Sequence, residues 1–414
     1  MPPSAEVVDP SVARLLIKIR GELNAEIDNP KKWLVHGSVL FANGYYSESA
    51  RALATAISIN REMPQATYIM ATALWKLNKQ EEAIIALEQA LELIPDYDMG
   101  WRLLAEWRLD RGEVVQAETF ARKAFELNSN RVGTRYILCQ ALMDSGQYSE
   151  AIKVIEQVTT LDKAPRWIYK LAGNCYRQLG ENDKAEQALA KAGPPFEDWP
   201  DPMFKHIPKL IAGKSELTLY ALHLFDTTGS QKAMPFLLRA FNINSEHLNL
   251  RVALSIAQQD AGQLGQSKKL LEDFQGEPSS TYWKQYASIC IATDELDVAQ
   301  EHIEKALALE PIDPNAHDIA AVIALEQNNP TKAVTHWEEA GKRYNEAERW
   351  VKAELSLAYA LENGSTNIET LRALALAQLK TGHFLQAKIT IQQLLKENPT
   401  DSVALDLEAM VPKE

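Results

Sequence analysis

Histidine is the residue type in this chain that could most readily bind a metal ion or carry a proton. The sequence has 8 histidines, and three of them, His302, His317 and His336, lie near enough along the chain to approach one another. The histidines are otherwise scattered, and no His-Glu-x-x-His pair occurs. We therefore interpret these three as independent histidines on helix surfaces or partly inside a core, and we expect no metal site.

The motifs of the common enzyme classes are missing. There is no Gly-x-Gly-x-x-Gly sequence, no phosphate-binding loop and no Gly-x-Ser-x-Gly elbow. The three cysteines, Cys139, Cys175 and Cys290, lie far apart and form neither a Cys-x-x-Cys pair nor a haem attachment site. Such cysteines are typical of reduced, buried small residues. We expect no catalytic residue and no cofactor.

Small residues recur in the sequence with a period of 34 residues, which is the strongest pattern in the chain. One set is Gly37, Ala71, Ala105, Cys139 and Gly173. A second set is Ser49, Ala83, Ala117, Ala151 and Ala185, and a third is Ala56, Ala90, Ala124, Val158 and Ala192. Between the first two sets lie turn residues at the same period: Gly44, Asn78, Gly112, Gly146 and Gly180.

The spacing predicts pairs of short helices joined by a tight turn. A small residue in the first helix lets the second helix approach closely, and small residues seven positions apart in the second helix share one face. Gly and Asn at the turn accept the left-handed conformation that ends a helix. After an interruption the pattern resumes at Ala221, Ser255, Ala287, Ala321 and Ala375, which gives about ten hairpins between residues 30 and 401.

This pattern resembles the tetratricopeptide repeat (TPR), whose signature is Trp-x-x-Leu-Gly-x-x-Tyr followed by Ala, Phe, Ala and Pro. The likeness is carried by Trp33 with Gly37, Trp101 with Leu104 and Ala105, Gly173 with Tyr176, and the run from Ala83 through Ala90 to Pro95. The resemblance implies an all-α fold, a right-handed α-solenoid of about ten helical hairpins with capping helices. It also implies a concave groove that binds proteins.

Two segments break the period. The first, from Gly193 to Pro202, is dense in proline, which forbids a helix. We interpret it as a rigid elbow between two arrays, followed by a short helix over about Met203–Ala212; the alternative is a loop that folds into the groove to contact a ligand. The second, between Tyr344 and Thr366, predicts one extra amphipathic helix, Glu346–Leu361.

The expected organisation follows from these breaks and from the two ends, where a helix over residues 9–28 and another over 401–410 would cover the exposed faces of the terminal hairpins. The predicted parts are a capping helix (1–29), an array of five hairpins (30–192), the proline-rich elbow and short helix (193–213), a second array (214–347), the extra helix (348–367), and a last hairpin with its cap (368–414).

Function in such an array lies on its inner wall, which the first helices form. The positions predicted to line that wall in the first array are rich in residue types that anchor bound proteins. The predicted peptide-binding residues are Tyr68, Thr72, Trp75, Arg102, Glu106, Tyr136, Gln140, Met143, Lys170, Asn174 and Arg177. Trp75, at the end of its helix, could equally fill the core between hairpins.

One specialised TPR groove clamps the tails of chaperones. In that clamp Lys and Asn in one repeat are followed by Asn in the next, then by Lys and Arg. Lys170 and Asn174 match the first pair, but the following unit offers Leu222 where Asn is required. The sequence therefore predicts that chaperone-tail binding is absent.

Charge and hydropathy narrow the remaining functions. The formal net charge of -13 repels phosphate backbones, so we expect no nucleic-acid partner. No basic leader precedes an apolar core at the N-terminus, and no run of eighteen apolar residues occurs, so we expect a cytoplasmic protein with no membrane insertion. A chain lacking its native signal would look the same and would be periplasmic.

The leading hypothesis is a non-catalytic scaffold or adaptor that holds an extended or helical segment of a protein partner in its groove. One alternative is an accessory subunit that selects substrates for an enzyme acting in trans, because the chain has no room for a catalytic domain of its own. The other is a self-assembling structural protein, which the capping helices argue against.

Overall fold

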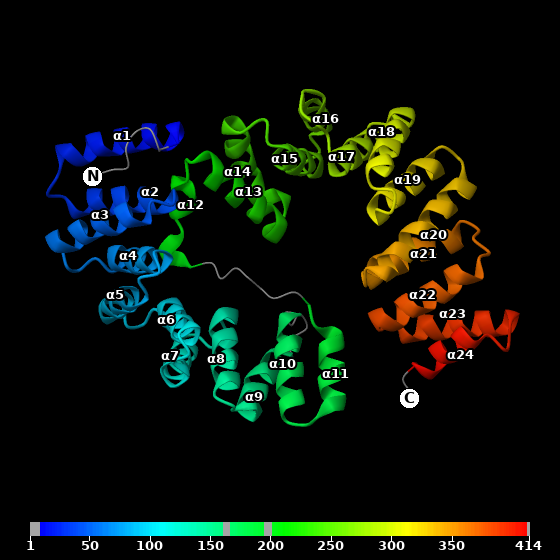
Figure 1. The fold of residues 1–414 in the computed structure, drawn as a ribbon, viewed down its shortest axis with the longest axis horizontal. Helices are drawn as coiled ribbons and strands as arrows, with labels where there is room; N and C mark the ends of the chain where they lie inside the picture. Colours follow the sequence, from blue (N-terminus) through cyan, green and yellow to red (C-terminus); the bar gives the residue numbers. More distant parts are fainter. Residues whose placement is uncertain (1–8, 160–165, 194–200, 412–414) are drawn as a thin grey trace. The chain divides into compact units, whose positions relative to one another are not determined.

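A computed structural model describes residues 9–159, 166–193 and 201–411, which fold as helices joined by short turns, with no strand in those ranges (Figure 1). The chain divides into two compact units, unit 1 (Met1–Glu216) and unit 2 (Leu217–Glu414). No helix within the described ranges combines the length and apolar character needed to cross a membrane. The all-helical repeat fold predicted from the sequence is confirmed.

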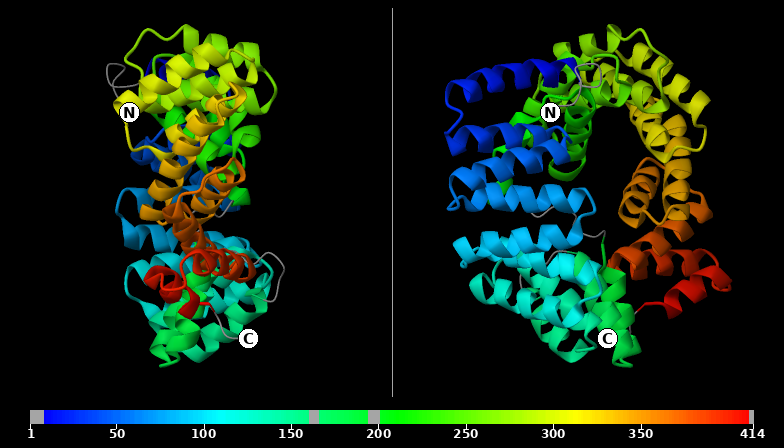
Figure 2. Two further views of the ribbon diagram at one scale, coloured as in Figure 1. Left: turned by 90° about the vertical axis from the view of Figure 1, so that its right-hand side faces the viewer. Right: turned by 60° about the vertical axis from the view of Figure 1, so that its left-hand side comes forward.

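Unit 1 begins with α1 (Pro10–Ala25), whose start is capped by the Asp9 carboxylate accepting from the backbone N–H of Ser11 at 2.7 Å. Five hairpins follow, in the part of the chain coloured from blue to green in Figure 2. They are α2 (Pro30–Ala42) with α3 (Tyr46–Ile59), α4 (Pro64–Lys76) with α5 (Gln80–Leu93), α6 (Asp98–Asp110) with α7 (Val114–Leu127), α8 (Val132–Asp144) with α9 (Tyr148–Thr159), and α10 (Trp167–Gln178) with α11 (Asn182–Lys191).

The turns within these hairpins have the predicted geometry. Gly44, Gly112, Gly146 and Gly180 have φ values of 81°, 74°, 76° and 79°, and Asn78 has 59°. A positive φ is the left-handed conformation that Gly and Asn tolerate best. The 34-residue spacing of these residues therefore reflects a backbone requirement repeated in each hairpin.

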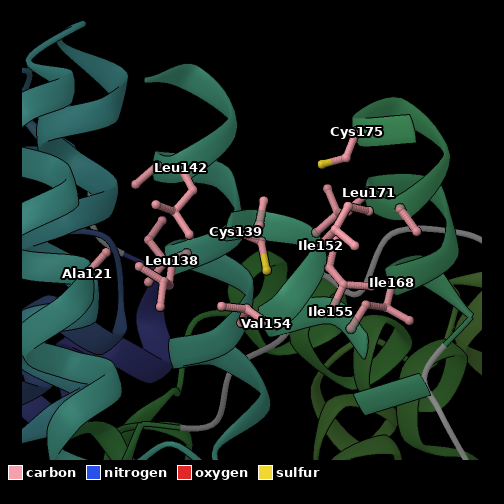
Figure 3. Close-up of a cluster of buried hydrophobic side chains, with 14 of the residues drawn as sticks. Ala121, Leu138, Cys139, Leu142, Ile152, Val154, Ile155, Ile168, Leu171 and Cys175 are labelled. Atoms are coloured by element: carbon pink, nitrogen blue, oxygen red, sulfur yellow. The ribbon is translucent and has the colours of Figure 1, made fainter. Parts of the chain in front are cut away.

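The core of unit 1 is built from small and aliphatic side chains between hairpins, and it includes two of the cysteines. Figure 3 shows Cys139 of α8 and Cys175 of α10 among Leu142, Ile155 and Ile168. All three cysteines are free and buried, as predicted. Burial raises the pKa of Cys139 to about 12 and that of Cys175 to about 11, so both remain protonated thiols.

Unit 2 consists of helical hairpins whose register changes once. They are α13 (Lys214–Thr228) with α14 (Ser230–Ile243), α15 (Leu248–Asp260) with α16 (Leu264–Glu272), α17 (Ser280–Ala292) with α18 (Leu296–Leu309), α19 (Pro314–Glu326) with α20 (Pro330–Glu346), and α22 (Ile368–Thr381) with α23 (Phe384–Glu397). Between the last two pairs lies α21 (Trp350–Glu362), and α24 (Ser402–Ala409) covers the end.

Helix α20 belongs to two hairpins at once. On one side Ala333 and Trp337 pack with Ala321 of α19, and on the other Tyr344 packs with Ala353 and Leu357 of α21. The region predicted as one extra helix, Glu346–Leu361, therefore holds the end of α20, a turn, and α21, which is the second helix of an overlapping hairpin. Sharing α20 shifts the register without interrupting the helical stack.

Close packing at this junction depends on Gly341 having no side chain. A Cβ atom there would lie 2.3 Å from Leu357 Cγ, so we expect Gly341→Ala to lower the free energy of unfolding by about 1 to 3 kcal/mol. Gly21, in the middle of α1, is the matched control because nothing lies within 4 Å of its added Cβ. Gly21→Ala should stabilise its helix by up to about 1 kcal/mol. Urea unfolding of both variants tests this prediction, and midpoint shifts in the same direction for Gly341→Ala and Gly21→Ala would contradict it.

Candidate binding groove of unit 1

The first helices of the hairpins line the inner surface of unit 1. Neighbouring first helices contact one another, as in α2 with α4, α6 with α8 and α8 with α10, whereas second helices of neighbouring hairpins make fewer such contacts. The predicted binding residues all lie on these first helices. Tyr68 and Arg102 are buried; Thr72, Trp75, Glu106, Tyr136, Gln140, Met143 and Asn174 are half-buried; Lys170 and Arg177 are exposed.

Part of this groove is already filled by the chain itself. Residues 201–213, which we call the strap, lie against α2 and α4 and include a short 3-10 turn, η1 (Pro202–Phe204), and a four-residue helix, α12 (Ile207–Leu210) (Figure 1). The strap follows α11 in sequence yet contacts the first three hairpins. It therefore runs back along the inner surface of the array that precedes it.

The first anchor of the strap is the Asp201 carboxylate. The phenol of Tyr68 donates a hydrogen bond to Asp201 Oδ2 at 2.6 Å, and the phenol of Tyr97 donates to Oδ1. Burial, reinforced by this carboxylate, raises the pKa of both phenols above the usual tyrosine value, so both remain donors. Charge-assisted bonds of this kind are stronger than neutral ones.

The second anchor is Phe204. Its ring stacks on Phe41 with centroids 5.7 Å apart and lies 5.6 Å from the ring of Tyr68. Between the two anchors Gln65 Nε2 donates to the backbone carbonyl of Met203 at 3.3 Å. The groove thus holds the strap by one carboxylate, one aromatic ring and a main-chain contact.

The far end of the strap is fixed by Asn43, which is only 3% exposed. Its side-chain oxygen accepts from the backbone N–H groups of Ala212 at 2.7 Å and Gly213 at 2.9 Å, and its Nδ2 donates to the Leu210 carbonyl at 3.0 Å. Beyond it, the backbone N–H of Lys214 donates to Asp9 Oδ2 at 2.8 Å. The strap is therefore tied to the capping segment as well as to the hairpins.

These contacts change the interpretation of the proline-rich segment. Asp201 and the residues after it lie in the groove, where a 3-10 turn and a four-residue helix replace the single helix predicted over Met203–Ala212. Gly193, at the start of the proline-rich segment, donates its backbone N–H to the Arg166 carbonyl at 3.1 Å. Residues 194–200, including Trp199, lie outside the described residues. Tyr68, predicted to face a free partner, is 0% exposed beneath the strap.

Other predicted groove residues contact side chains of the array. The ring of Trp75 stacks on Trp107 with centroids 4.5 Å apart and planes within 3°, and Arg102 pairs with Glu106 at 2.7 Å. In the part of the groove beyond the strap, Gln140 Nε2 donates to the Tyr136 hydroxyl at 2.8 Å. Further along the same wall, Lys170 and Arg177 extend into solvent and Asn174 is half-buried. This stretch, on α8 and α10, leaves polar and cationic side chains accessible.

Sequence reasoning missed Asn43, Gln65, Tyr97 and Asp201 as groove residues. Gln65 lies three positions before Tyr68 and so shares its helix face, which a wider choice of inner positions would have included. Tyr97 precedes α6 and Asn43 follows α2, at helix ends that the periodic pattern does not assign to a face. No local signal in the sequence pairs Asp201 with tyrosines more than one hundred positions away.

In unit 2, the three histidines that could have formed a metal site separate into a pair and a single residue. His317 Nδ1 and His336 Nδ1 lie 3.0 Å apart, whereas His302 stacks on Tyr286 with centroids 4.1 Å apart. Among the described residues no group of three or more His, Cys, Asp or Glu side chains is placed to hold a metal ion. The geometry offers one hydrogen-bonded histidine pair, which is too few ligands for a zinc site.

The pair makes unit 2 sensitive to acid. Burial, with smaller effects from His317 and Lys332, lowers the pKa of His336 from 6.5 to about 4. Folding therefore favours the neutral form of His336. The contribution of neutral His336 to the free energy of unfolding is present above pH 6.5 and is lost as the pH falls toward 4. We expect this loss to be about 1 kcal/mol, allowing for partial solvent screening. Urea midpoints at pH 7 and pH 5 should differ less for His336→Gln than for the wild type; equal differences would contradict this.

Unit 2 has an inner hollow of its own, of about 370 Å³, between α15, α17 and α19. It is lined by Gln259, Ser288, Ile291, Ala292, Asp318, Ile319 and Val322. Burial raises the pKa of Asp318, whose Oδ1 accepts a hydrogen bond from Ser356 at 2.7 Å. The predicted site residues were confined to the first array, so this second inner surface was not anticipated.

Comparison with known proteins agrees with the repeat geometry. The tetratricopeptide repeat family model matches residues 34–98, and the model described as anaphase-promoting complex, cyclosome, subunit 3 matches residues 110–192. Human protein IFIT1 homolog B is 30% identical over 135 residues, 30% of this chain and 28% of that protein. A TPR repeat-containing protein of Methanocaldococcus jannaschii is 24% identical over 170 residues, 41% of this chain and 30% of that protein. The chain thus spans less than a third of either relative.

Solved structures with a similar arrangement include Naa15/Naa10 bound to HypK-THB, with a TM-score of 0.34, 15% identity, and coverage of 96% of this chain and 76% of that one. Yeast Tom70 has a TM-score of 0.30 and 15% identity over 92% of this chain and 94% of its own. Unit 1 therefore contains tetratricopeptide repeats, which the family model matches over residues 34–98.

Proposed function

We propose that this chain is a non-catalytic scaffold that holds an extended or helical segment of a protein partner along the inner surface of unit 1. The observation that carries the proposal is the strap. The groove already holds a polypeptide segment by side-chain anchors and by main-chain contacts. A surface that binds its own chain in this way has the chemistry needed to bind another chain.

The partner would lie beyond the strap, on α8 and α10. There Gln140, Asn174 and the exposed cations Lys170 and Arg177 offer hydrogen bonds and positive charge. Polar and charged groups of this kind fix the register of a bound segment and favour an acidic one. Half-buried Tyr136 and Met143 supply apolar contact area beside them.

A non-catalytic role agrees with the chemistry of the described residues. The cysteines are protonated and buried, and the clustered histidines form only a pair. A nucleophile needs a lowered pKa or an adjacent base, and neither thiol of unit 1 has a lowered pKa.

Affinity purification of the tagged full chain from its source cells, with quantitative mass spectrometry, tests the proposal. Gln140→Ala combined with Lys170→Ala should reduce recovery of the specific partner by about tenfold, the effect of losing one or two good contacts. Val115→Ala is the matched control, because Val115 is 80% exposed on the second helix of its hairpin. Equal recovery from all three proteins would refute groove binding in this part of unit 1.

A further inference from the structure

The strap shows which chemistry the first part of the groove recognises. Its carboxylate at Asp201 and its aromatic ring at Phe204 are three positions apart, and each meets a separate feature of the wall. Two neutral phenols, Tyr68 and Tyr97, take one carboxylate oxygen each. A single phenol could serve any acceptor, but two that converge on one group select for a carboxylate.

The aromatic position is equally specific. Phe204 is stacked on Phe41 and tilted against Tyr68, so the wall presents ring faces and edges to a planar side chain. Tyr68 takes part in both features, since its hydroxyl contacts Asp201 while its ring contacts Phe204. Tyr68 therefore fixes the distance between the acid and the ring in any segment that binds here.

The backbone between the two anchors is recognised without regard to sequence. Gln65 donates to the Met203 carbonyl, and the Met203 N–H donates to the Tyr97 hydroxyl at 3.3 Å. By contrast, Lys205 and His206, which follow Phe204, are exposed. The part of the strap that Phe41, Gln65, Tyr68 and Tyr97 contact is thus Asp201–Phe204: an acid, a turn-forming pair and an aromatic residue.

We propose that Phe41, Gln65, Tyr68 and Tyr97 form a recognition site for protein segments in which an acidic residue precedes an aromatic residue by three positions. The strap is the resident ligand of this site, and a partner segment of that chemistry competes with it. The proposal rests on the proposed function, because it specifies one kind of segment that the groove of unit 1 takes.

Competition by the strap has a predictable strength. The strap is covalently joined to α11 and α13, so its effective concentration at the groove is on the order of millimolar. A free peptide of micromolar affinity would hardly displace it from the wild-type chain. Removing the two anchors of the strap should expose the site, while Asn43 still holds the far end of the strap.

The probe is a fluorescein-labelled peptide with the sequence of residues 201–208, Asp-Pro-Met-Phe-Lys-His-Ile-Pro. Fluorescence anisotropy should show saturable binding to the full chain carrying Asp201→Ala and Phe204→Ala, and binding at least about tenfold weaker to the wild type. Peptides with Asn in place of the acid, or Ala in place of the ring, should each bind about tenfold more weakly. A peptide with Ala in place of the lysine should bind as well as the parent.

On the protein side, adding Tyr97→Phe to the double variant should weaken peptide binding about tenfold, whereas adding Val115→Ala should not change it. Native hydrogen exchange in α2 to α11 shows that the double variant is folded. The proposal is overturned if the folded double variant shows no saturable peptide binding, or if the altered peptides bind as tightly as the parent peptide. Should the double variant not fold, the isosteric Asp201→Asn variant replaces it, with the same outcomes.

The result is separable from that of the partner purification. Partner recovery that depends on Gln140 and Lys170, without peptide binding, leaves the scaffold function standing and makes the strap a fixed part of unit 1. If the peptide binds but partner recovery does not depend on Gln140 and Lys170, the recognition site is supported and the proposed role of α8 and α10 is refuted.

Discussion

Replacing Tyr68 with alanine should lower the free energy of unfolding of unit 1 by about 3 to 5 kcal/mol, the range measured for removing a large aromatic side chain from a core. Tyr68 is 0% exposed. The substitution leaves a cavity between Tyr97 and Phe204, whose ring centroids lie 5.8 and 5.6 Å from that of Tyr68. It also leaves Asp201 Oδ2 without its phenol donor. Hydrogen exchange of the full chain, resolved by segment, measures the effect within unit 1.

Tyr136 is the matched control, because it occupies the same position two hairpins further along and is only half-buried. Tyr136→Ala should cost about 1 to 2 kcal/mol. Tyr68→Phe keeps the ring and removes only the hydroxyl, so it should cost a similar amount. If Tyr68→Ala is no more destabilising than Tyr136→Ala, the strap does not cover Tyr68 as described.

Replacing Asn43 with alanine should cost about 3 kcal/mol and release the far end of the strap. The buried amide of Asn43 serves two strap N–H groups and one strap carbonyl. Alanine would leave these groups without partners, and an unsatisfied buried polar group costs about 1 to 3 kcal/mol. The amides of Ala212 and Gly213 should then exchange with deuterium much faster than in the wild type.

Lys205→Ala provides the comparison for this variant, because Lys205 belongs to the strap but is exposed. A surface substitution of this kind should change stability by less than about 0.5 kcal/mol. Unchanged protection of Ala212 and Gly213 in Asn43→Ala would show that the strap does not depend on this amide.

The repeats could be predicted because they are local. The small residues at Gly37 and Gly173 and the turn residues such as Gly44 and Asn78 each meet a requirement set within one hairpin, and the 34-residue period repeats it. The ends of second helices follow a local rule too: α5 ends at Leu93 and α18 at Leu309, each two residues before a proline, Pro95 and Pro311.

The register shift in unit 2 is also encoded locally, by a second repeat signature inside one helix. Trp337, Ala340, Gly341 and Tyr344 have the spacing of the first-helix signature, although they lie in what was counted as a second helix. Gly341 and Ala375 are 34 positions apart, so a second register begins inside α20. A period that gives each helix to one hairpin cannot predict a helix that belongs to two.

The strap could not be predicted in the same way, because its contacts join residues far apart in sequence. Asp201 pairs with Tyr68 across 133 positions and Leu210 with Asn43 across 167. Proline density in residues 193–202 predicted a break in the helical array, but it gave no information about where the following segment lies. The role of the inner positions on α8 and α10 in binding a partner remains a prediction.

The central claim is that the inner surface of unit 1 holds a protein partner, and site-specific photo-crosslinking in the source cells tests it most directly. A benzophenone amino acid at position 170, on the inner wall, should crosslink to a discrete protein partner. The same amino acid at position 115, on the second helix of its hairpin, should not. A partner that crosslinks from position 115 and not from position 170 would contradict the account.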